Sequence, residues 1–323
     1  MIEILQSGGL TTVQDTGRRG HARLGIGRAG ALDDLALRVG NRLLGNPPQA
    51  AGLEILLPPF RARVDVDTDI AVTGAGARLQ AGGKRLPPWS RITLAAGEEL
   101  ALEAPMQGQA VYLCVRGGIS VPVVLGSSST DLKFAFGGLE GRPLCRGDRF
   151  QVPVSPGALR ACAVAPPEMP ALGASGVPGV GAATPLRFLP GMEWSRLGTQ
   201  RQRALTANHW RVSRHSNRIG FRLEGDPIPL ERPLEMLSHG VLPGLIQLPP
   251  AGEPIVLLCD AQTVGGYPRL GVVIEQDLRR LAQTPVGQRV RFRPCTPAQA
   301  TEAEAEAHRW FADFSRWLEV FDA

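Results

Sequence analysis

Polar side chains crowd the segment 260–269, which lies between two apolar runs, 255–259 and 270–274, each typical of a buried strand. The residues of interest are Asp260, Gln262, Thr263, Gly265, Gly266 and Tyr267. Polar groups where strands end are often binding groups, and glycines let the backbone approach a ligand closely. The segment therefore predicts a ligand-binding turn, although a tight hairpin whose Asp and Thr bond their own backbone fits the same residues.

A second polar turn, Ser216-Asn217-Arg218, follows a strand-like run that begins at Trp210. An asparagine beside an arginine can bind an amide or carboxylate edge, because the two side chains offer several donors and an acceptor. The alternative is a capped turn in which Arg218 pairs with Glu224. Both interpretations of this turn stay open on the sequence.

Two more residues have side chains suited to the same chemistry. His239 lies in a loop between a serine and a glycine, and it is the best general acid or base by residue type. A lone loop histidine is more often a hydrogen-bonding surface residue. Gln247 ends a strand-like run, where its amide would either bond a ligand amide or face solvent.

The glycine-punctuated loop 8–20 contains a candidate anion-binding pair, Asp15 and Arg18. Arginine offers a planar fork of donors, and the glycines free backbone amides. An internal Asp–Arg pair that fixes the loop explains the same residues and is the favoured alternative.

Several reaction classes lack their motifs. No His-x-x-His or comparable cluster predicts a metal site, and no Gly-x-x-x-x-Gly-Lys-Ser/Thr predicts a phosphate-binding loop for ATP. No Ala-Met-Lys-Met is present, so the chain carries no biotin of its own. Lys84 and Lys133 are the only lysines, which disfavours lysine chemistry.

The composition favours strands and turns in more than one domain, since the 323 residues are 43% hydrophobic but 5% aromatic, with 39 glycines and 28 prolines. The net charge of +5 is spread along the chain, which disfavours nucleic acid as a partner. Five well-separated cysteines predict reduced thiols. Without a signal segment or an apolar span, we expect a soluble cytoplasmic protein that binds no membrane.

Hydrophobic spacing and turn residues divide the chain into four parts. Residues 1–165 predict a first β-barrel domain with one helix at 31–44, and residues 166–185 are a linker rich in Pro, Gly and Ala. Residues 186–296 repeat the short-strand pattern as a second β-barrel domain. Residues 297–323 predict an amphipathic helix whose aromatic stripe packs on its own domain.

Motifs spread over most of the chain occur in the order found in one protein family. They lie at 9–18, 30–33, 71–75, 116–118, 125–130, 137–142, 216–220, 244–247 and 260–268. From about residue 2 to residue 292 the chain resembles the allophanate hydrolase subunit 2 family, whose members are also called KipA or the C-type subunit of 5-oxoprolinase. The same module forms half of the carboxyltransferase domain of urea carboxylase and urea amidolyase.

The resemblance implies a mainly β fold of two cyclophilin-like β-barrel domains plus the C-terminal helix. It implies the C-type subunit of a heteromeric, ATP-dependent 5-oxoprolinase, an amide-bond hydrolase that opens 5-oxoproline to glutamate and is inactive alone. Its partners would be two further proteins of the complex, one KipI-like and one LamB/YcsF-like. The complex would use ATP, and this chain would bind no cofactor of its own.

Two alternatives stay open beside that interpretation. The chain would be half of a biotin-dependent carboxyltransferase, acting on a urea- or allophanate-type amide with biotin supplied in trans. Otherwise it would be a non-catalytic regulator that sequesters a KipI-like kinase inhibitor.

The resemblance also implies roles for the polar turns around a small amide or lactam substrate. Arg218 would stabilise charge on an activated carbonyl oxygen, and Asp260 would act as a base if its surroundings make the carboxylate more basic. The substrate-binding residues would be Ser216, Asn217, His239, Gln247, Gln262, Thr263, Gly265, Gly266 and Tyr267. Residue 264 is a valine where the family usually has a second threonine.

Overall fold

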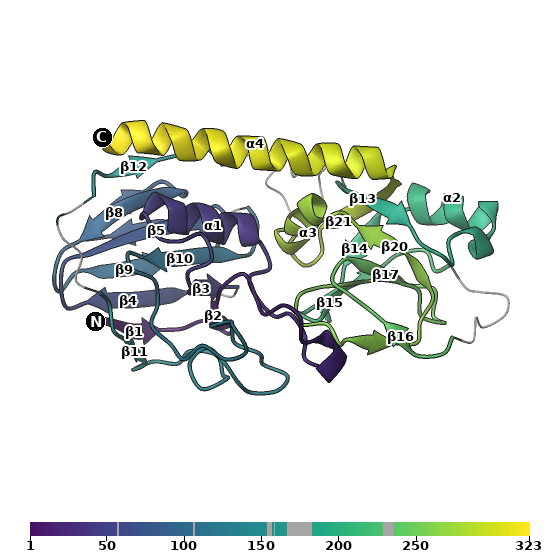
Figure 1. Ribbon diagram of the computed structural model, residues 1–323, viewed down its shortest axis with the longest axis horizontal. Helices are drawn as coiled ribbons and strands as arrows, with labels where there is room; N and C mark the ends of the chain where they lie inside the picture. The colour runs from purple at the N-terminus through teal and green to yellow at the C-terminus, as the bar shows by residue number, and fades with distance from the viewer. Residues whose placement is uncertain (57, 106, 154–156, 158, 167–182, 229–235) are drawn as a thin grey trace. The chain divides into compact units, whose positions relative to one another are not determined.

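The computed structural model describes residues 1–56, 58–105, 107–153, 157, 159–166, 183–228 and 236–323. These residues divide into two compact units (Figure 1). The first unit comprises 1–19, 29–168 and 310–323, and the second comprises 20–28 and 169–309. Each unit has its own strands and its own core, and each is described separately.

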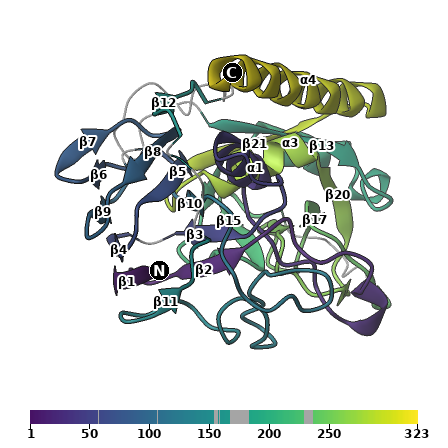
Figure 2. The same ribbon diagram turned by 60° about the vertical axis from the view of Figure 1, so that its left-hand side comes forward.

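The first unit is built from two six-stranded sheets. One sheet has the order β11 (Arg149–Phe150), β1 (Ile2–Gln6), β4 (Phe60–Val64), β9 (Glu99–Leu102), β6 (Leu79–Ala81) and β7 (Lys84–Leu86). The other has the order β12 (Cys162–Ala163), β8 (Ser90–Leu94), β5 (Thr68–Gly74), β10 (Val111–Val115), β3 (Gly52–Ile55) and β2 (Thr11–Gln14). Figure 2 shows β9, β6 and β7 side by side at one end of the first sheet.

Side-chain alternation explains why the central strands of the second sheet are buried throughout. Val111, Leu113 and Val115 of β10 point into the core shared with the first sheet. Tyr112 and Cys114, on the opposite face, pack under α1 (Asp34–Leu43). The sheet therefore lies between two apolar layers, as in a sheet covered on both faces.

The C-terminal helix α4 (Pro297–Asp322) supplies the outer apolar layer with α1. Phe314 and Leu318 are buried in the cluster that contains the inner face of α1. At the end of α4, Asp322 pairs with the guanidinium of Arg91, which also donates to the Leu43 carbonyl at 2.6 Å. Of the predicted aromatic stripe, Phe314 is buried in this cluster, whereas Trp317 is 44% exposed.

The second unit contains a closed barrel of seven strands. Their order is β13 (Thr184–Pro190), β20 (Arg269–Val273), β17 (Leu245–Gln247), β18 (Ile255–Leu257), β15 (Gly220–Glu224), β14 (Trp210–Val212) and β21 (Arg289–Pro294). The pair β13–β21 is parallel and closes the circuit. Two short strands, β16 (His239–Gly240) and β19 (Val264–Gly265), form a separate antiparallel ribbon.

The remaining helices are short and decorate the second unit. They are η1 (Ala22–Leu24), η2 (Ser195–Leu197), α2 (Thr199–Ala207) and α3 (Glu275–Ala282). The buried Trp210 donates its indole N–H to the Leu205 carbonyl of α2 at 3.0 Å, which ties this helix to the barrel.

The prediction of a mainly β chain with a C-terminal helix is confirmed. The two-barrel form of that prediction is not confirmed, because the described strands of the first unit form two sheets and only the second unit closes. The predicted helix at 31–44 begins three residues later, where the Asp33 carboxylate caps it by accepting from the Ala36 N–H. Most of the predicted linker, 167–182, lies outside the described residues.

Candidate functional site

Arg218 and Asp260, the two predicted catalytic residues, form a buried ion pair. The Arg218 Nε and Nη2 atoms donate to the two Asp260 carboxylate oxygens, each at 2.9 Å. Both side chains are at most 5% exposed. A bidentate pair of this kind fixes the orientation of the guanidinium and carboxylate planes. It therefore holds the turn that carries Arg218 against the loop that begins at Asp260.

The neighbouring polar residues of the first turn hold its shape. The exposed Asn217 accepts from the Ile219 N–H at 2.9 Å through Oδ1, and Ser216 Oγ accepts from the Arg222 N–H at 3.1 Å. The alternative pairing of Arg218 with Glu224 is wrong, because Glu224 instead accepts from Arg211 at 3.1 Å. The pKa of Glu224 is lowered, chiefly by the hydrogen bond from Ser213 and to a smaller extent by the hydrogen bond from Arg211.

The residues of the loop after Asp260 differ in their exposure and in their hydrogen bonds. The Thr263 carbonyl accepts from the Val241 N–H at 3.0 Å, which extends the pairing of β16 with β19. Tyr267 is 44% exposed, and Gly266 lies next to it in an exposed turn. Their side chains and backbone therefore lie at the surface of the second unit, within reach of a ligand approaching this loop.

The side-chain amides of Gln247 and Gln262 lie close to Gly265 of the β16–β19 ribbon. A Cβ atom built on Gly265 would lie 2.8 Å from Gln247 Nε2 and 3.7 Å from Gln262 Nε2. Gln247 is 2% exposed, yet its Nε2 has no hydrogen-bond partner among the described residues. His239 of β16 is paired directly with Gly265, so the four residues converge on one place.

Glu193 is a positioning residue that sequence reasoning missed. Its buried carboxylate accepts from the backbone N–H, Nε and Nη2 of Arg269, at 3.1, 3.0 and 2.9 Å. Arg269 ends the motif 260–269, so this pair anchors the far end of the loop that Arg218 anchors at its start. The hydrogen bond from Arg269 lowers the pKa of Glu193 against the opposing effect of burial.

Asp15 and Arg18 belong to the first unit, where they build a loop-to-loop network. The Asp15 carboxylate accepts from the Gly17 N–H at 2.7 Å and from Ser127 Oγ, the Ser128 N–H and Ser129 Oγ, each at 2.6 Å. Arg18 donates to the Ser129 carbonyl and stacks over the Phe136 ring, 4.6 Å from its centroid. These contacts hold the loop in place, while the anion-binding role of Asp15 and Arg18 stays a prediction.

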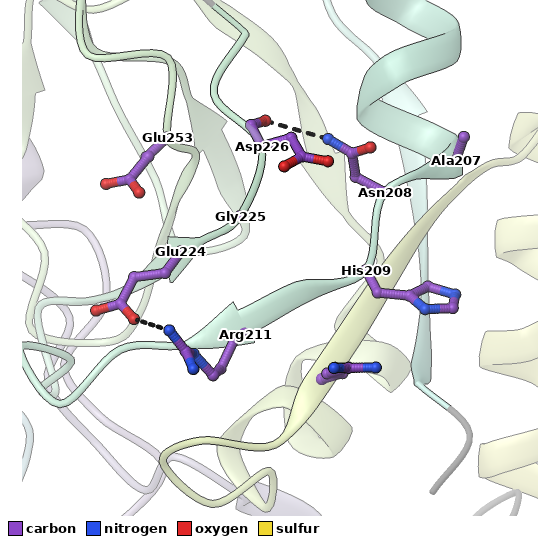
Figure 3. Close-up of a pocket in the computed structure, with 9 residues that line it drawn as sticks. Ala207, Asn208, His209, Arg211, Glu224, Gly225, Asp226 and Glu253 are labelled. Atoms are coloured by element: carbon purple, nitrogen blue, oxygen red, sulfur yellow. Dashed lines mark hydrogen bonds and ion pairs between the residues drawn. The ribbon is translucent and has the colours of Figure 1, made fainter. Parts of the chain in front are cut away.

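A surface pocket of about 660 Å³ lies elsewhere in the second unit (Figure 3). Its lining residues are Ala207, Asn208, His209, Arg211, Glu224, Gly225, Asp226, Glu253 and Arg289. Arg211 pairs with Glu224, and Asn208 donates to the Asp226 carbonyl at 3.1 Å, so these polar groups bind one another (Figure 3). None of the predicted site residues lines this pocket.

Within the described residues, no three His, Cys, Asp or Glu side chains are grouped so that they could hold a metal ion. None of the described helices combines the length and the apolar character needed to cross a membrane.

A two-sheet unit and a seven-stranded barrel unit carry these residues, and the sequence that forms the two units matches the carboxyltransferase class of module. Residues 24–294 match the family model described as carboxyltransferase domain, subdomain A and B. The chain belongs to this family, which confirms the resemblance noted from its motifs.

The chain matches one group of related proteins over nearly their full length and another over part of their length. The chain is 41% identical over 311 residues to the C-type subunit of 5-oxoprolinase from Escherichia coli (strain K12), covering 96% of each chain. Among solved structures, it resembles TTHA0988 with a TM-score of 0.80 and 31% identity, covering 90% of this chain and 55% of that one. It resembles the K. lactis urea amidolyase with a TM-score of 0.86 and 26% identity, covering 97% of this chain and 20% of that one.

Proposed function

We propose that this chain is the C-type subunit of a heteromeric 5-oxoprolinase, an ATP-dependent hydrolase that opens the lactam of 5-oxoproline to glutamate. The observation that carries the proposal is the end-to-end similarity to the corresponding 5-oxoprolinase chain of Escherichia coli, which covers nearly all of both chains. The amide side chains gathered at Gly265 support it, because amides bind amide substrates by complementary hydrogen bonds.

Within this proposal the buried Arg218–Asp260 pair acts on the substrate loop. Arg218 would stabilise charge that develops on the substrate carbonyl oxygen, while Asp260 would hold the guanidinium in place. Because the guanidinium already donates two hydrogen bonds to a carboxylate, Asp260 is better suited to orienting Arg218 than to accepting a proton. Gln262, Thr263 and the paired glycines would supply the rest of the substrate surface.

ATP would enter the reaction as a co-substrate bound mainly by another protein of the complex. The cation of the candidate site is matched by the Asp260 carboxylate, so this site lacks the excess positive charge that favours a triphosphate. We propose a KipI-like protein and a LamB/YcsF-like protein as the partners, with this chain inactive without them. We also propose that both units are variants of a cyclophilin-like barrel.

The test is reconstitution. The chain is co-expressed with the KipI-like and LamB/YcsF-like proteins, and phosphate release that depends on 5-oxoproline is measured with each of the three omitted in turn. We expect turnover from the three-part mixture and none from this chain alone. Tight binding of the KipI-like protein without any turnover would instead favour a regulator that sequesters a kinase inhibitor.

A second candidate function is half of a biotin-dependent carboxyltransferase acting on a urea- or allophanate-type amide. The family match and the fold shared with the K. lactis urea amidolyase favour it. Biotin would come from another protein and supply the carboxyl group. Co-purification of a biotinylated protein, with urea-dependent carboxylation, would support this function over lactam hydrolysis.

A further inference from the structure

Two buried nitrogen atoms near the candidate site lack hydrogen-bond partners within the described part of the chain. They are Gln247 Nε2 on β17 and His239 Nε2 on β16. An unpaired buried polar group costs free energy, so native proteins keep such groups where a ligand or water satisfies them. Two of them at one place are therefore a sign of a binding surface.

The pairing of β16 with β19 puts both atoms on one side of the ribbon. His239 lies directly opposite Gly265, and side chains directly opposite in an antiparallel pair project to the same face. A Cβ on Gly265 would point at Gln247 Nε2, 2.8 Å away, so that face is the one turned toward Gln247. The His239 ring consequently projects toward the Gln247 amide.

The hydrogen bonding of His239 determines which ligand groups the surface can bind. Its Nδ1 lies 3.1 Å from the Leu237 carbonyl oxygen, which can only accept, so Nδ1 carries the proton. In the neutral ring Nε2 is then an acceptor, whereas Gln247 Nε2 is a donor. An acceptor beside a donor matches a ligand that presents one N–H and one C=O on the same edge.

We infer that the surface formed by His239, Gln247 and Gly265 binds a cis-amide edge, with His239 Nε2 accepting the ligand N–H and Gln247 Nε2 donating to its carbonyl oxygen. A lactam holds its amide in this cis form, and urea presents the same edge. The inference rests on the proposed function for its choice of lactam. It goes further by naming the two atoms that distinguish an amide from a carboxylate.

Gly265 keeps the Gln247 amide where the ligand requires it. A Cβ on Gly265 would lie 2.8 Å from Gln247 Nε2, which is closer than van der Waals contact. An alanine would therefore displace the Gln247 amide from the position in which it donates to the ligand. Gly265→Ala should weaken lactam binding even though its backbone suits an alanine.

The test measures binding directly, on the full chain alone and on the reconstituted complex, by ligand-observed NMR. The probe is 2-pyrrolidinone, a lactam without a carboxylate. N-methyl-2-pyrrolidinone, which lacks the N–H, should bind about tenfold more weakly, the effect of one lost hydrogen bond at a buried site. Urea in competition distinguishes a lactam-selective surface from one that takes any cis amide.

The informative variant is Gln247→Leu, which keeps the side-chain volume and removes the unpaired amide. We expect 2-pyrrolidinone to bind about tenfold more weakly. The melting temperature should stay the same or rise, because Gln247 Nε2 has no hydrogen-bond partner among the described residues and a buried polar group disappears. Loss of binding with gain of stability is a signature that a purely structural glutamine would not give.

Gln202→Leu is the matched control, because Gln202 Nε2 donates to the Trp194 carbonyl at 2.8 Å. This change should lower stability and leave binding unchanged. Equal binding of the two pyrrolidinones, wild-type binding by Gln247→Leu, or binding of 5-oxoproline without any binding of 2-pyrrolidinone would each overturn the inference. If lactams bind as expected but the complex releases no phosphate, the proposed function fails and the inference stands.

Discussion

Arg218 and Asp260, 42 residues apart in the chain, meet as a bidentate ion pair with both hydrogen bonds at 2.9 Å. The pair is buried and joins the turn before β15 to the loop after β18. The candidate substrate loop is held at both ends by ion pairs, because Glu193 pairs with Arg269 at the end opposite to Asp260. Between these anchors the loop carries Gln262, Gly265 and Gly266, and its Val264–Gly265 segment pairs with β16.

Asp260→Asn should destabilise the protein by about 3–5 kcal/mol, because it removes the carboxylate charge that pairs with the buried Arg218 guanidinium. Turnover of the reconstituted complex should fall with it. Urea denaturation and phosphate release measure the two effects. The control is Asp226→Asn at an exposed carboxylate, which should change stability by no more than about 0.5 kcal/mol.

A double variant separates structure from chemistry at the same pair. Arg218→Met with Asp260→Leu should recover much of the lost stability, since apolar replacements of a buried ion pair are often neutral. It should not recover turnover. A complex with Asp260→Asn that keeps wild-type turnover would remove Asp260 from the mechanism.

Val264→Thr restores the hydroxyl usual in the family, and we expect it to change little. Val264 is 58% exposed and precedes Gly265 in β19, so its side chain projects away from the face turned toward Gln247. Lactam binding, measured by NMR, should stay within about twofold, as for other surface substitutions. A larger gain in affinity would mean that residue 264 contacts the ligand.

The sequence predicts the elements that have a strong hydrophobic pattern. It does not predict the elements whose burial comes from tertiary contacts. Strand β14 (Trp210–Val212) and helix α4 were predicted from apolar spacing. Helix α2 was missed because it buries Leu205 alone among its residues and has no apolar stripe. Strand β2 (Thr11–Gln14) was assigned to a loop because its residues are mostly polar, although all four are buried.

The candidate site divides in the same manner. Residue types and their positions after apolar runs were enough to select Arg218, Gln247 and Asp260. They were not enough to predict the partner of Arg218. Glu224 is closer to Arg218 in the sequence, and only the closed barrel brings Asp260 to the guanidinium. Glu193 had no local signal, since it lies 76 residues before the arginine it holds.

Glu193→Gln should destabilise the protein by about 1.5–3 kcal/mol near neutral pH, the usual value of a hydrogen bond to a charged group. The pKa of Glu193 is lowered from its ordinary value of 4.5, chiefly by Arg269, so its contribution is complete above that value. It is lost as the pH falls through the lower folded-state pKa. The stability difference between wild type and variant should therefore shrink in acid; a difference that grows as pH falls would contradict this sign.

The anchoring of α4 on the first unit can be tested with two substitutions on one helix. Leu318 is 2% exposed in the cluster under α1, whereas Val320 is 79% exposed two residues later. Leu318→Ala should cost about 2–4 kcal/mol by removing buried methyl groups and leaving a cavity. Val320→Ala should stay within about 0.5 kcal/mol, measured by urea denaturation with tryptophan fluorescence. Equal effects of the two changes would show that α4 does not pack through Leu318.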